Sequence, residues 1–441
     1  MPEGMLALLM FPTLFVLILA GLPVAYALIA CAFAFGLPFF GDKLGTQLFG
    51  GLTELAKNYT LSAIPLFILM GTILEASGIA ERLFKTMQIW FGRLPGGLCV
   101  AALSMCALFA ATTGVFGAVE IVIGLMAIPV MLERKYNHGL IAGTICAGGS
   151  LGTIIPPSVT MLVYAAIADL SVGDLFAGVL LPGLLMTLYF VVYVVVRCTI
   201  RPQDGAPLPR ELFGSMSLGE KLGLTLGAIA PALLLIIAVL GSTLAGIASP
   251  TEASAVGVLG GIVLAAAYGR LNRKMLIDAL KKTVSLSAVI MLILGAGALF
   301  SSVFIVNGGR TMVITLMQAL DFPPWGVVAL FLAILFLLGF ILDWVSMLLV
   351  CIPVFHPVVV SLGFDPLWFA VMVAVVIQTS YLTPPLAPAV FYFKTIAPPQ
   401  ITLPQMLRGV MPFVCVELFV LLSVAFVPAL ATYLPQVLFA R

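Results

Sequence analysis

Long apolar stretches recur along almost the whole chain and are separated by short polar segments. Stretches of this length are typical of helices that cross a membrane. The pattern predicts simple membrane helices at about 5–20, 22–40, 60–77, 174–197, 224–244, 250–268, 285–306 and 408–433. The sequence therefore predicts an all-α polytopic membrane protein.

Two apolar regions contain a turn where a span should continue. Residues 95–133 and 325–356 each hold two apolar arms around a small or polar tip. The first tip lies near Thr112, Thr113 and Gly114, and the second runs from Gly339 to Ser346. Both regions are predicted to be re-entrant helical hairpins.

Two further regions, 138–168 and 367–397, are interrupted by the proline pairs Pro156-Pro157 and Pro384-Pro385. Proline lacks a backbone N–H and clashes with the preceding turn, so each pair predicts a broken helix. A broken helix at bilayer depth is tolerated only where it is buried in protein or lines a cavity. Breaks at matching positions of two halves indicate the binding site of a transporter.

The two proline pairs are 228 positions apart, and other short matches keep their order at spacings of 224 to 230. This indicates an internal duplication of residues 1–221 and 222–441. The first half has five net crossings if its hairpin returns to the starting side. An odd number inverts the second half, so we expect two inverted-topology repeats, each with one hairpin and one broken helix.

The charges test this topology. The chain is 62% hydrophobic and 9% charged, against about 25% charged in soluble domains. All but four of the 20 Lys and Arg residues fall on one side of the predicted membrane. By the positive-inside rule that side is cytoplasmic, and both termini face outside. A basic amphipathic segment at 270–284 is expected either to lie in the interface or to form an ordinary solvated helix.

No Walker loop, nucleophile–base pair or metal-ligand cluster is present in the sequence. We therefore expect neither an enzyme nor an ATP-driven pump. Ser, Thr and Gly residues precede both proline pairs, and unwound carbonyls with hydroxyls supply the hard oxygen ligands that Na⁺ takes. Asp343 and Glu120 are the carboxylates most expected to function inside the membrane, whereas Glu252 is expected to stabilise a helix N-terminus.

At these residues the chain resembles the large membrane subunit of TRAP (tripartite ATP-independent periplasmic) transporters. The resemblance covers the whole chain. It is carried by Ile64–Gly71, Gly152–Ser158, Leu175–Gly178, Pro182–Gly183, Ser249–Ala253 and Leu382–Pro385. It implies an ion-transporter-like fold that moves as an elevator, with two Na⁺ sites, each between a hairpin tip and a broken helix.

Carried onto this sequence, the resemblance gives three sets of residues. The first Na⁺ is expected near Thr112, Thr113, Gly114, Gly152, Thr153 and Pro156. The second is expected near Gly339, Asp343, Thr379, Thr383 and Pro384. The substrate is expected between the tips, near Thr113, Ser150, Pro157, Ser158, Ser346, Ser380 and Pro385.

The resemblance also implies two protein partners, a small four-helix membrane subunit and a periplasmic substrate-binding protein. We expect Na⁺-driven uptake of an organic acid across the bacterial cytoplasmic (inner) membrane. The lipid bilayer and the acid are the other expected partners, and no nucleic acid is expected. A stand-alone dicarboxylate carrier of the same fold, H⁺ coupling through Asp343 and Glu120, and an anion channel with re-entrant loops remain open alternatives.

Overall fold

The computed structural model describes residues 4–113, 117–209, 217–319, 322–384 and 387–439, with only the backbone at 5, 112, 113, 118, 218, 314 and 316–319. These residues form an all-helical molecule in which no strand is present among the described residues. Seven described segments are long and apolar enough to cross a membrane, and an eighth if a bent pair counts as one span. The predicted fold class, an all-α polytopic membrane protein, is confirmed.

The first half begins with three helices and a 3₁₀ turn and then reaches the predicted hairpin and broken helix. Its elements are α1 (Met5–Leu19), α2 (Val24–Phe40), η1 (Gly41–Lys43), α3 (Leu44–Lys57), α4 (Ala63–Ala76), α5 (Ile79–Phe91), α6 (Gly97–Thr113), α7 (Ala118–Glu133), α8 (His138–Ser150), η2 (Leu151–Thr153), α9 (Val159–Ala168) and α10 (Val172–Ile200).

The second half has the same order of elements after a short 3₁₀ turn, η3 (Pro202–Asp204). Its elements are α11 (Leu218–Ile236), the π-helical turn η5 (Ile237–Gly241), α12 (Ser242–Leu244), α13 (Pro250–Ala267), α14 (Arg273–Val306), α15 (Gly309–Ala319), α16 (Pro324–Leu338), α17 (Trp344–Ser361), α18 (Pro366–Leu382), α19 (Pro388–Ile396), α20 (Leu403–Phe426) and α21 (Ala429–Phe439).

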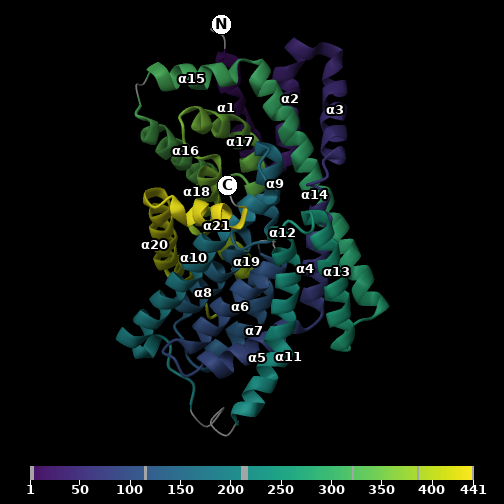
Figure 1. Ribbon diagram of the computed structural model, residues 1–441. Helices are drawn as coiled ribbons and strands as arrows, with labels where there is room; N and C mark the ends of the chain where they lie inside the picture. The colour runs from purple at the N-terminus through teal and green to yellow at the C-terminus, as the bar shows by residue number, and fades with distance from the viewer. Residues whose placement is uncertain (1–3, 114–116, 210–216, 320–321, 385–386, 440–441) are drawn as a thin grey trace.

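Both hairpins and both broken helices lie where the sequence predicts them. The hairpins are α6–α7 and α16–α17, and the broken helices are α8–η2–α9 and α18–α19. In Figure 1 the first hairpin lies in the lower half of the molecule and the second in the upper half. α8 lies below its continuation α9, whereas α18 lies above its continuation α19. The two broken helices therefore run in opposite senses, as inverted repeats require.

Helix pairing follows the same relation between the halves. α4 packs against α13 while α14 packs against α2, and α8 packs against α20 while α18 packs against α10. The second arm of each broken helix contacts the second arm of the opposite hairpin, α9 with α17 and α19 with α7. Equivalent elements thus exchange partners between the halves. The boundaries at 1–221 and 222–441 stay predictions.

Local sequence explains the helix boundaries. α13 begins with a capping box in which Ser249 and Glu252 bond each other's backbone N–H groups, so the expected role of Glu252 at a helix N-terminus is confirmed. α4 and α5 meet at an angle of 66°. Gly78 makes this bend with a φ of 78°, a left-handed conformation that costs glycine little.

Three elements differ from the prediction. Residues 270–284 do not form a separate interfacial helix, because α14 continues from Arg273 through the predicted span to Val306. The predicted helix at 408–433 is divided into α20 and α21. The short amphipathic helices α5 and α15 were not predicted, since their mixed apolar and polar residues give no membrane-span signal.

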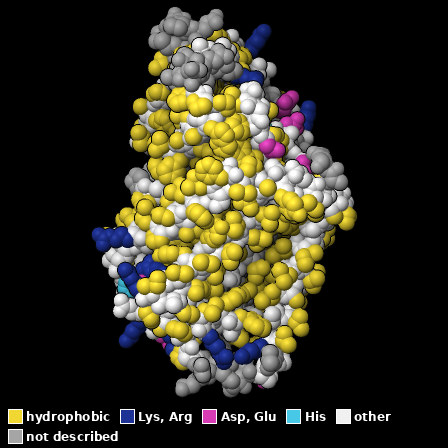
Figure 2. Space-filling view, turned by 60° about the vertical axis from the view of Figure 1, so that its left-hand side comes forward, with side chains coloured by type: hydrophobic (Ala, Val, Ile, Leu, Met, Phe, Trp, Pro, Cys, Tyr) yellow, Lys and Arg dark blue, Asp and Glu magenta, His cyan; other side chains and the backbone are white. Residues whose placement is uncertain are grey.

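The surface agrees with a protein that lies in lipid. Figure 2 shows hydrophobic side chains over most of one face, with most of the visible Lys and Arg side chains in the lower half. On α11 and at the start of η5, Leu226, Leu234 and Ile237 are each more than 60% exposed. Such exposure is stable where the helix contacts acyl chains, because a membrane has no water for these groups to avoid.

Candidate functional site

The second hairpin is built around Asp343. Its side chain caps α17 by accepting hydrogen bonds from the backbone N–H groups of Val345 (3.0 Å) and Ser346 (3.3 Å). The Ser346 hydroxyl donates to the other carboxylate oxygen of Asp343. The carboxylate therefore fixes the conformation of the tip, and its negative charge lies at the positive end of the α17 dipole.

This tip packs directly on the end of α18. A Cβ placed on Gly339 would meet the Ser380 Oγ and lie 2.6 Å from the Ser380 Cβ. Gly339 and Ser380, which the sequence assigned to the second Na⁺ site and to the substrate, are therefore brought together. Only a residue without a side chain allows the hairpin to approach this closely.

The first hairpin packs in the same way on the end of α8. A Cβ on Gly148 would lie 2.5 Å from the Cys106 Sγ of α6, and a Cβ on Gly149 would lie 2.6 Å from the Glu120 Cβ of α7. Thr112 and Thr113 end α6, and only their backbone is described. Gly114 lies outside the described residues.

The first helix break has four predicted residues in its turn. Gly152 and Thr153 belong to η2, and Pro156 and Pro157 lie between η2 and α9. The Thr153 hydroxyl donates to the Ser150 carbonyl (2.8 Å). Ser158 occupies the N-cap position of α9, and its hydroxyl donates to the Thr153 carbonyl (2.6 Å).

The second break has the same chemistry. The Thr379 hydroxyl donates to the Val375 carbonyl (2.8 Å), and the Thr383 hydroxyl donates to the Thr379 carbonyl (2.7 Å). Thr383 ends α18 in an extended conformation, with Pro384 after it. Pro385 lies outside the described residues.

These hydroxyl groups suit a small hard cation. Thr153, Ser158, Thr379 and Thr383 each donate their only hydroxyl hydrogen to a backbone carbonyl, so their oxygen lone pairs are free to accept. No group of three His, Cys, Asp or Glu side chains that could hold a metal occurs in the part of the chain described. The hydroxyl and carbonyl oxygens at the breaks are neutral ligands, of the kind that hard cations take.

Tyr392 of α19 lies beside the first hairpin and was not found from the sequence. Its ring atoms are 3.6 Å from the Cβ position of Gly117 at the first tip, and α19 packs against α7 of the same hairpin. Its place after the second proline pair was the available signal, but the sequence alone did not show which tip it would face.

A direct contact between the broken helices was also missed. Gln378 Nε2 of α18 donates to Ser150 Oγ of α8 over 2.8 Å. Both side chains are fully buried, as is Glu417 of α20 beside them. The spacing of 228 between Ser150 and Gln378 equals that of the proline pairs, and this was the signal that could have indicated the contact.

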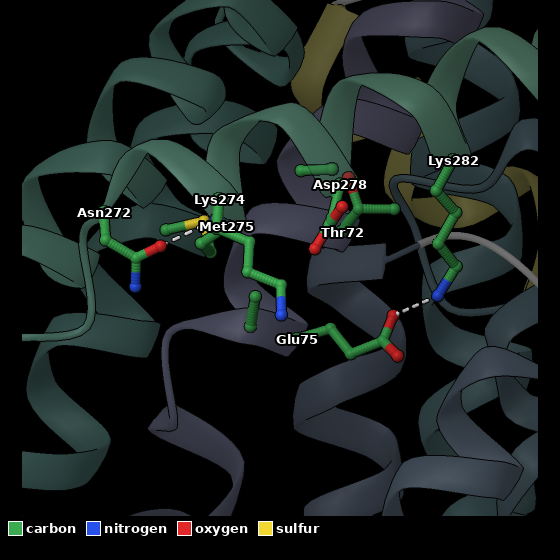
Figure 3. A pocket seen from close by; sticks show the side chains of 9 residues that line it. Thr72, Glu75, Asn272, Lys274, Met275, Asp278 and Lys282 are labelled. Carbon is green, nitrogen blue, oxygen red and sulfur yellow. Dashed lines mark hydrogen bonds and ion pairs between the residues drawn. The ribbon is translucent and has the colours of Figure 1, made fainter.

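One cavity lies apart from all the predicted site residues. It has a volume of about 420 Å³ and is lined by residues of α4 and the start of α14. Figure 3 shows Lys282 reaching across it to Glu75, with 2.6 Å between Nζ and the carboxylate oxygen. This ion pair joins α14 to α4, so the cavity lies at a contact between the two halves.

Comparison with known proteins decides the family. The family model described as "Tripartite ATP-independent periplasmic transporter, DctM component" matches residues 11–430. The chain belongs to this family. It is thus a large permease subunit of a TRAP transporter, as the resemblance in the sequence implied.

Three relatives illustrate the range of this permease family. The C4-dicarboxylate TRAP transporter large permease protein DctM of Pseudomonas aeruginosa is 31% identical over 87% of this chain and 88% of its own length. The ectoine/5-hydroxyectoine permease UehC of Ruegeria pomeroyi is 29% identical over 99% and 100%. The sialic acid permease SiaM of Vibrio cholerae is 28% identical over 95% and 96%.

Solved structures support the fold of the permease. The Alcanivorax borkumensis YdaH transporter aligns with a TM-score of 0.65 at 15% identity, covering 95% of this chain and all of that one. Neisseria gonorrhoeae MtrF aligns with a TM-score of 0.59 at 14% identity, covering 87% and 83%. At these identities the likeness shows the fold alone.

Proposed function

We propose that this permease takes up an organic acid across the bacterial inner membrane by Na⁺ symport, after a periplasmic binding protein delivers the acid. One observation carries the proposal. Two helix breaks, each next to a helical hairpin, present hydroxyl oxygens whose hydrogens are already donated to the backbone. Transporters of this kind place substrate and coupling ions at broken helices near the middle of the bilayer.

The Na⁺ sites are proposed at the two breaks, one near Thr153 and the first tip and one near Thr379, Thr383 and the second tip. The substrate is proposed between the tips, beside Tyr392. The helix N-terminus of α9, where no side chain caps the first N–H groups, would attract its carboxylate. The names of the relatives that transport C4-dicarboxylates and sialic acid support an acid as the substrate class.

The proposed movement is of the elevator type, in which the hairpins and broken helices move together against the other helices. The tight contacts of Gly339 with Ser380 and of Gly149 with Glu120 support this division, because each hairpin is locked to its broken helix. A ligand shifts such an equilibrium only by its different affinity for the two states. Na⁺ is therefore proposed to favour the arrangement that binds the acid.

The small four-helix membrane subunit and the binding protein are proposed as partners, and both termini are proposed to be periplasmic. The test is uptake of labelled organic acids into proteoliposomes that contain the permease and its small subunit. We expect uptake that requires both the cognate binding protein and an inward Na⁺ gradient. Loss of uptake when choline replaces Na⁺ at constant pH separates Na⁺ coupling from H⁺ coupling.

Each other outcome selects a different function. Saturable uptake without the binding protein indicates a stand-alone carrier of the same fold. Uptake that follows a pH gradient and ignores Na⁺ indicates H⁺ coupling. Single-channel currents in planar bilayers, without saturable uptake, indicate an anion channel.

A further inference from the structure

The two broken helices touch at equivalent positions. Ser150 lies at the end of α8 and Gln378 lies in the last turns of α18, with 228 positions between them. The same spacing separates the proline pairs. The 2.8 Å contact between Gln378 Nε2 and Ser150 Oγ therefore lies at the point where the two related halves of the permease meet.

A carboxylate from a third helix completes this junction. Glu417 of α20 has no exposed surface, and its Oε1 lies 3.4 Å from Ser150 Oγ. The Ser150 hydroxyl has one hydrogen and makes a shorter contact, 2.8 Å, with the Ala147 carbonyl. That hydrogen is thus better placed for the backbone than for Glu417.

Two oxygen atoms of the junction have no donor. Glu417 Oε2 and Gln378 Oε1 are both buried and both without a hydrogen-bond partner. The two side chains are close enough to each other to interact. Both orphan atoms are acceptors, so in this arrangement they cannot bond each other, whereas a hydrogen on Glu417 could be donated to the Gln378 amide oxygen.

Among the described residues, no Lys, Arg or His side chain forms an ion pair with Glu417. Arg197 of α10 pairs with Asp204, and Lys394 of α19 and Arg408 of α20 are exposed. The other titratable groups on the helices around α20 are Cys146 and His138 of α8, Tyr381 of α18, Asp174, Tyr189, Tyr193 and Cys198 of α10, Tyr392 of α19, Cys415 of α20 and Tyr433 of α21.

We propose that Glu417, Ser150 and Gln378 form a proton-binding site at which a protonated Glu417 holds the two broken helices together. The added hydrogen supplies the donor that the orphan oxygens lack, and the neutral acid avoids an unpaired buried charge. Loss of the proton places a bare negative charge between α8, α18 and α20 and weakens the junction. Glu417 itself belongs to neither proposed Na⁺ site, whereas Ser150 borders the first one, because its carbonyl accepts from the Thr153 hydroxyl.

The protonation state can be measured without transport. Infrared spectra of the purified permease in lipid nanodiscs show a carbonyl stretching band for protonated carboxyl groups. We expect Glu417→Gln to remove part of this band at a pH where exposed carboxylates are ionised. Glu75→Gln is the matched control, because it makes the same substitution at a glutamate that pairs with Lys282 and lies outside the junction. A Glu417→Gln spectrum identical to the wild-type spectrum in this region overturns the proposal.

A second variant covers the case in which Glu417→Gln does not fold. Gln378→Leu removes the amide that faces Glu417, so the band of the wild-type carboxyl group should shift in frequency. A band that does not move contradicts the proposed junction. If the wild-type band disappears when Na⁺ is added, the site binds a metal ion, and the proposal that it holds a proton is refuted.

Uptake then tests what the proton does. With a constant Na⁺ gradient, we expect wild-type uptake to fall as the pH rises and the Glu417→Gln permease to lose this pH dependence while keeping uptake. Glu417→Ala, which cannot bridge the helices, should lose uptake at every pH. A Glu417→Gln permease with the wild-type pH profile refutes the regulatory role. If no variant or wild-type preparation shows Na⁺-dependent uptake, the proposed function fails, while the infrared result still decides the proton site.

Discussion

The substitution Gly339→Ala tests whether the second hairpin must close tightly on α18. Gly339 ends α16 with an ordinary helical backbone, so an alanine there is not strained by its own conformation. The added methyl group would instead meet Ser380, whose Cβ lies 2.6 Å from the Cβ position. Ser380 is fully buried and its hydroxyl bonds the Ile377 carbonyl, so neither partner has free space to move into.

The size of the effect follows from this overlap. An extra methylene forced into a well-packed region costs about 1–3 kcal/mol. If this cost falls only on the closed hairpin, the ratio of closed to open hairpins decreases by roughly fivefold to more than a hundredfold, since about 1.4 kcal/mol is a factor of ten. Because the second tip is proposed to form part of the second Na⁺ site, half-maximal uptake should need more Na⁺, by up to this factor.

The assay is initial uptake rate as a function of Na⁺ concentration in proteoliposomes, together with thermal unfolding of the same preparation. Gly227→Ala is the matched control, because a Cβ at Gly227 in α11 meets nothing within 4 Å. That control should leave the Na⁺ dependence unchanged and slightly raise the unfolding temperature, since alanine favours a helix over glycine by about 1 kcal/mol.

A second substitution separates packing from other causes. Ser380→Gly removes both atoms that the new methyl group would meet, so it should restore Na⁺ affinity when added to Gly339→Ala, relative to Ser380→Gly alone. Wild-type Na⁺ dependence in Gly339→Ala would refute the tight-closure reasoning. Equal losses in the presence and absence of Ser380→Gly would show that the effect does not arise from this contact.

Three further predictions address single contacts. Thr153→Val and Thr379→Val keep the side-chain shape but remove a proposed ligand oxygen, so Na⁺ affinity measured by uptake should fall about tenfold or more while the unfolding temperature changes little. An unchanged affinity in both would exclude these hydroxyls as ligands. Lys282→Met breaks a partly exposed ion pair with Glu75 and should lower the free energy of unfolding by no more than about 1 kcal/mol. A larger loss would show that this ion pair is important for the packing of α14 against α4. Ser249→Ala removes the α13 cap and should cost about 1 kcal/mol, whereas Ser249→Thr should keep most of it, and equal losses in both would argue against capping.

Much of the fold could be predicted because lipid restricts the choices. A backbone in a bilayer must satisfy its own polar groups, so apolar runs of sufficient length are read as helices with little ambiguity. The proline pairs at Pro156 and Pro384 fixed the helix breaks for the same reason. The prediction failed where this constraint is weaker. The segment at 270–284 joined α14, and the amphipathic helices α5 and α15 were missed.

The sequence by itself determined the class of protein, the order of its elements, both hairpins and both breaks, because hydrophobic periodicity and proline act within a few residues of the chain. It also carried the family, through motifs that lie at those breaks. It did not determine which side chains meet across the halves. Whether Gln378 reaches Ser150, or Tyr392 reaches Gly117, depends on how α18 and α19 pack against helices more than 200 positions away. The tertiary structure alone also placed Glu417 in full burial, since a single carboxylate in an apolar helix has the same sequence pattern at the interface as in the core.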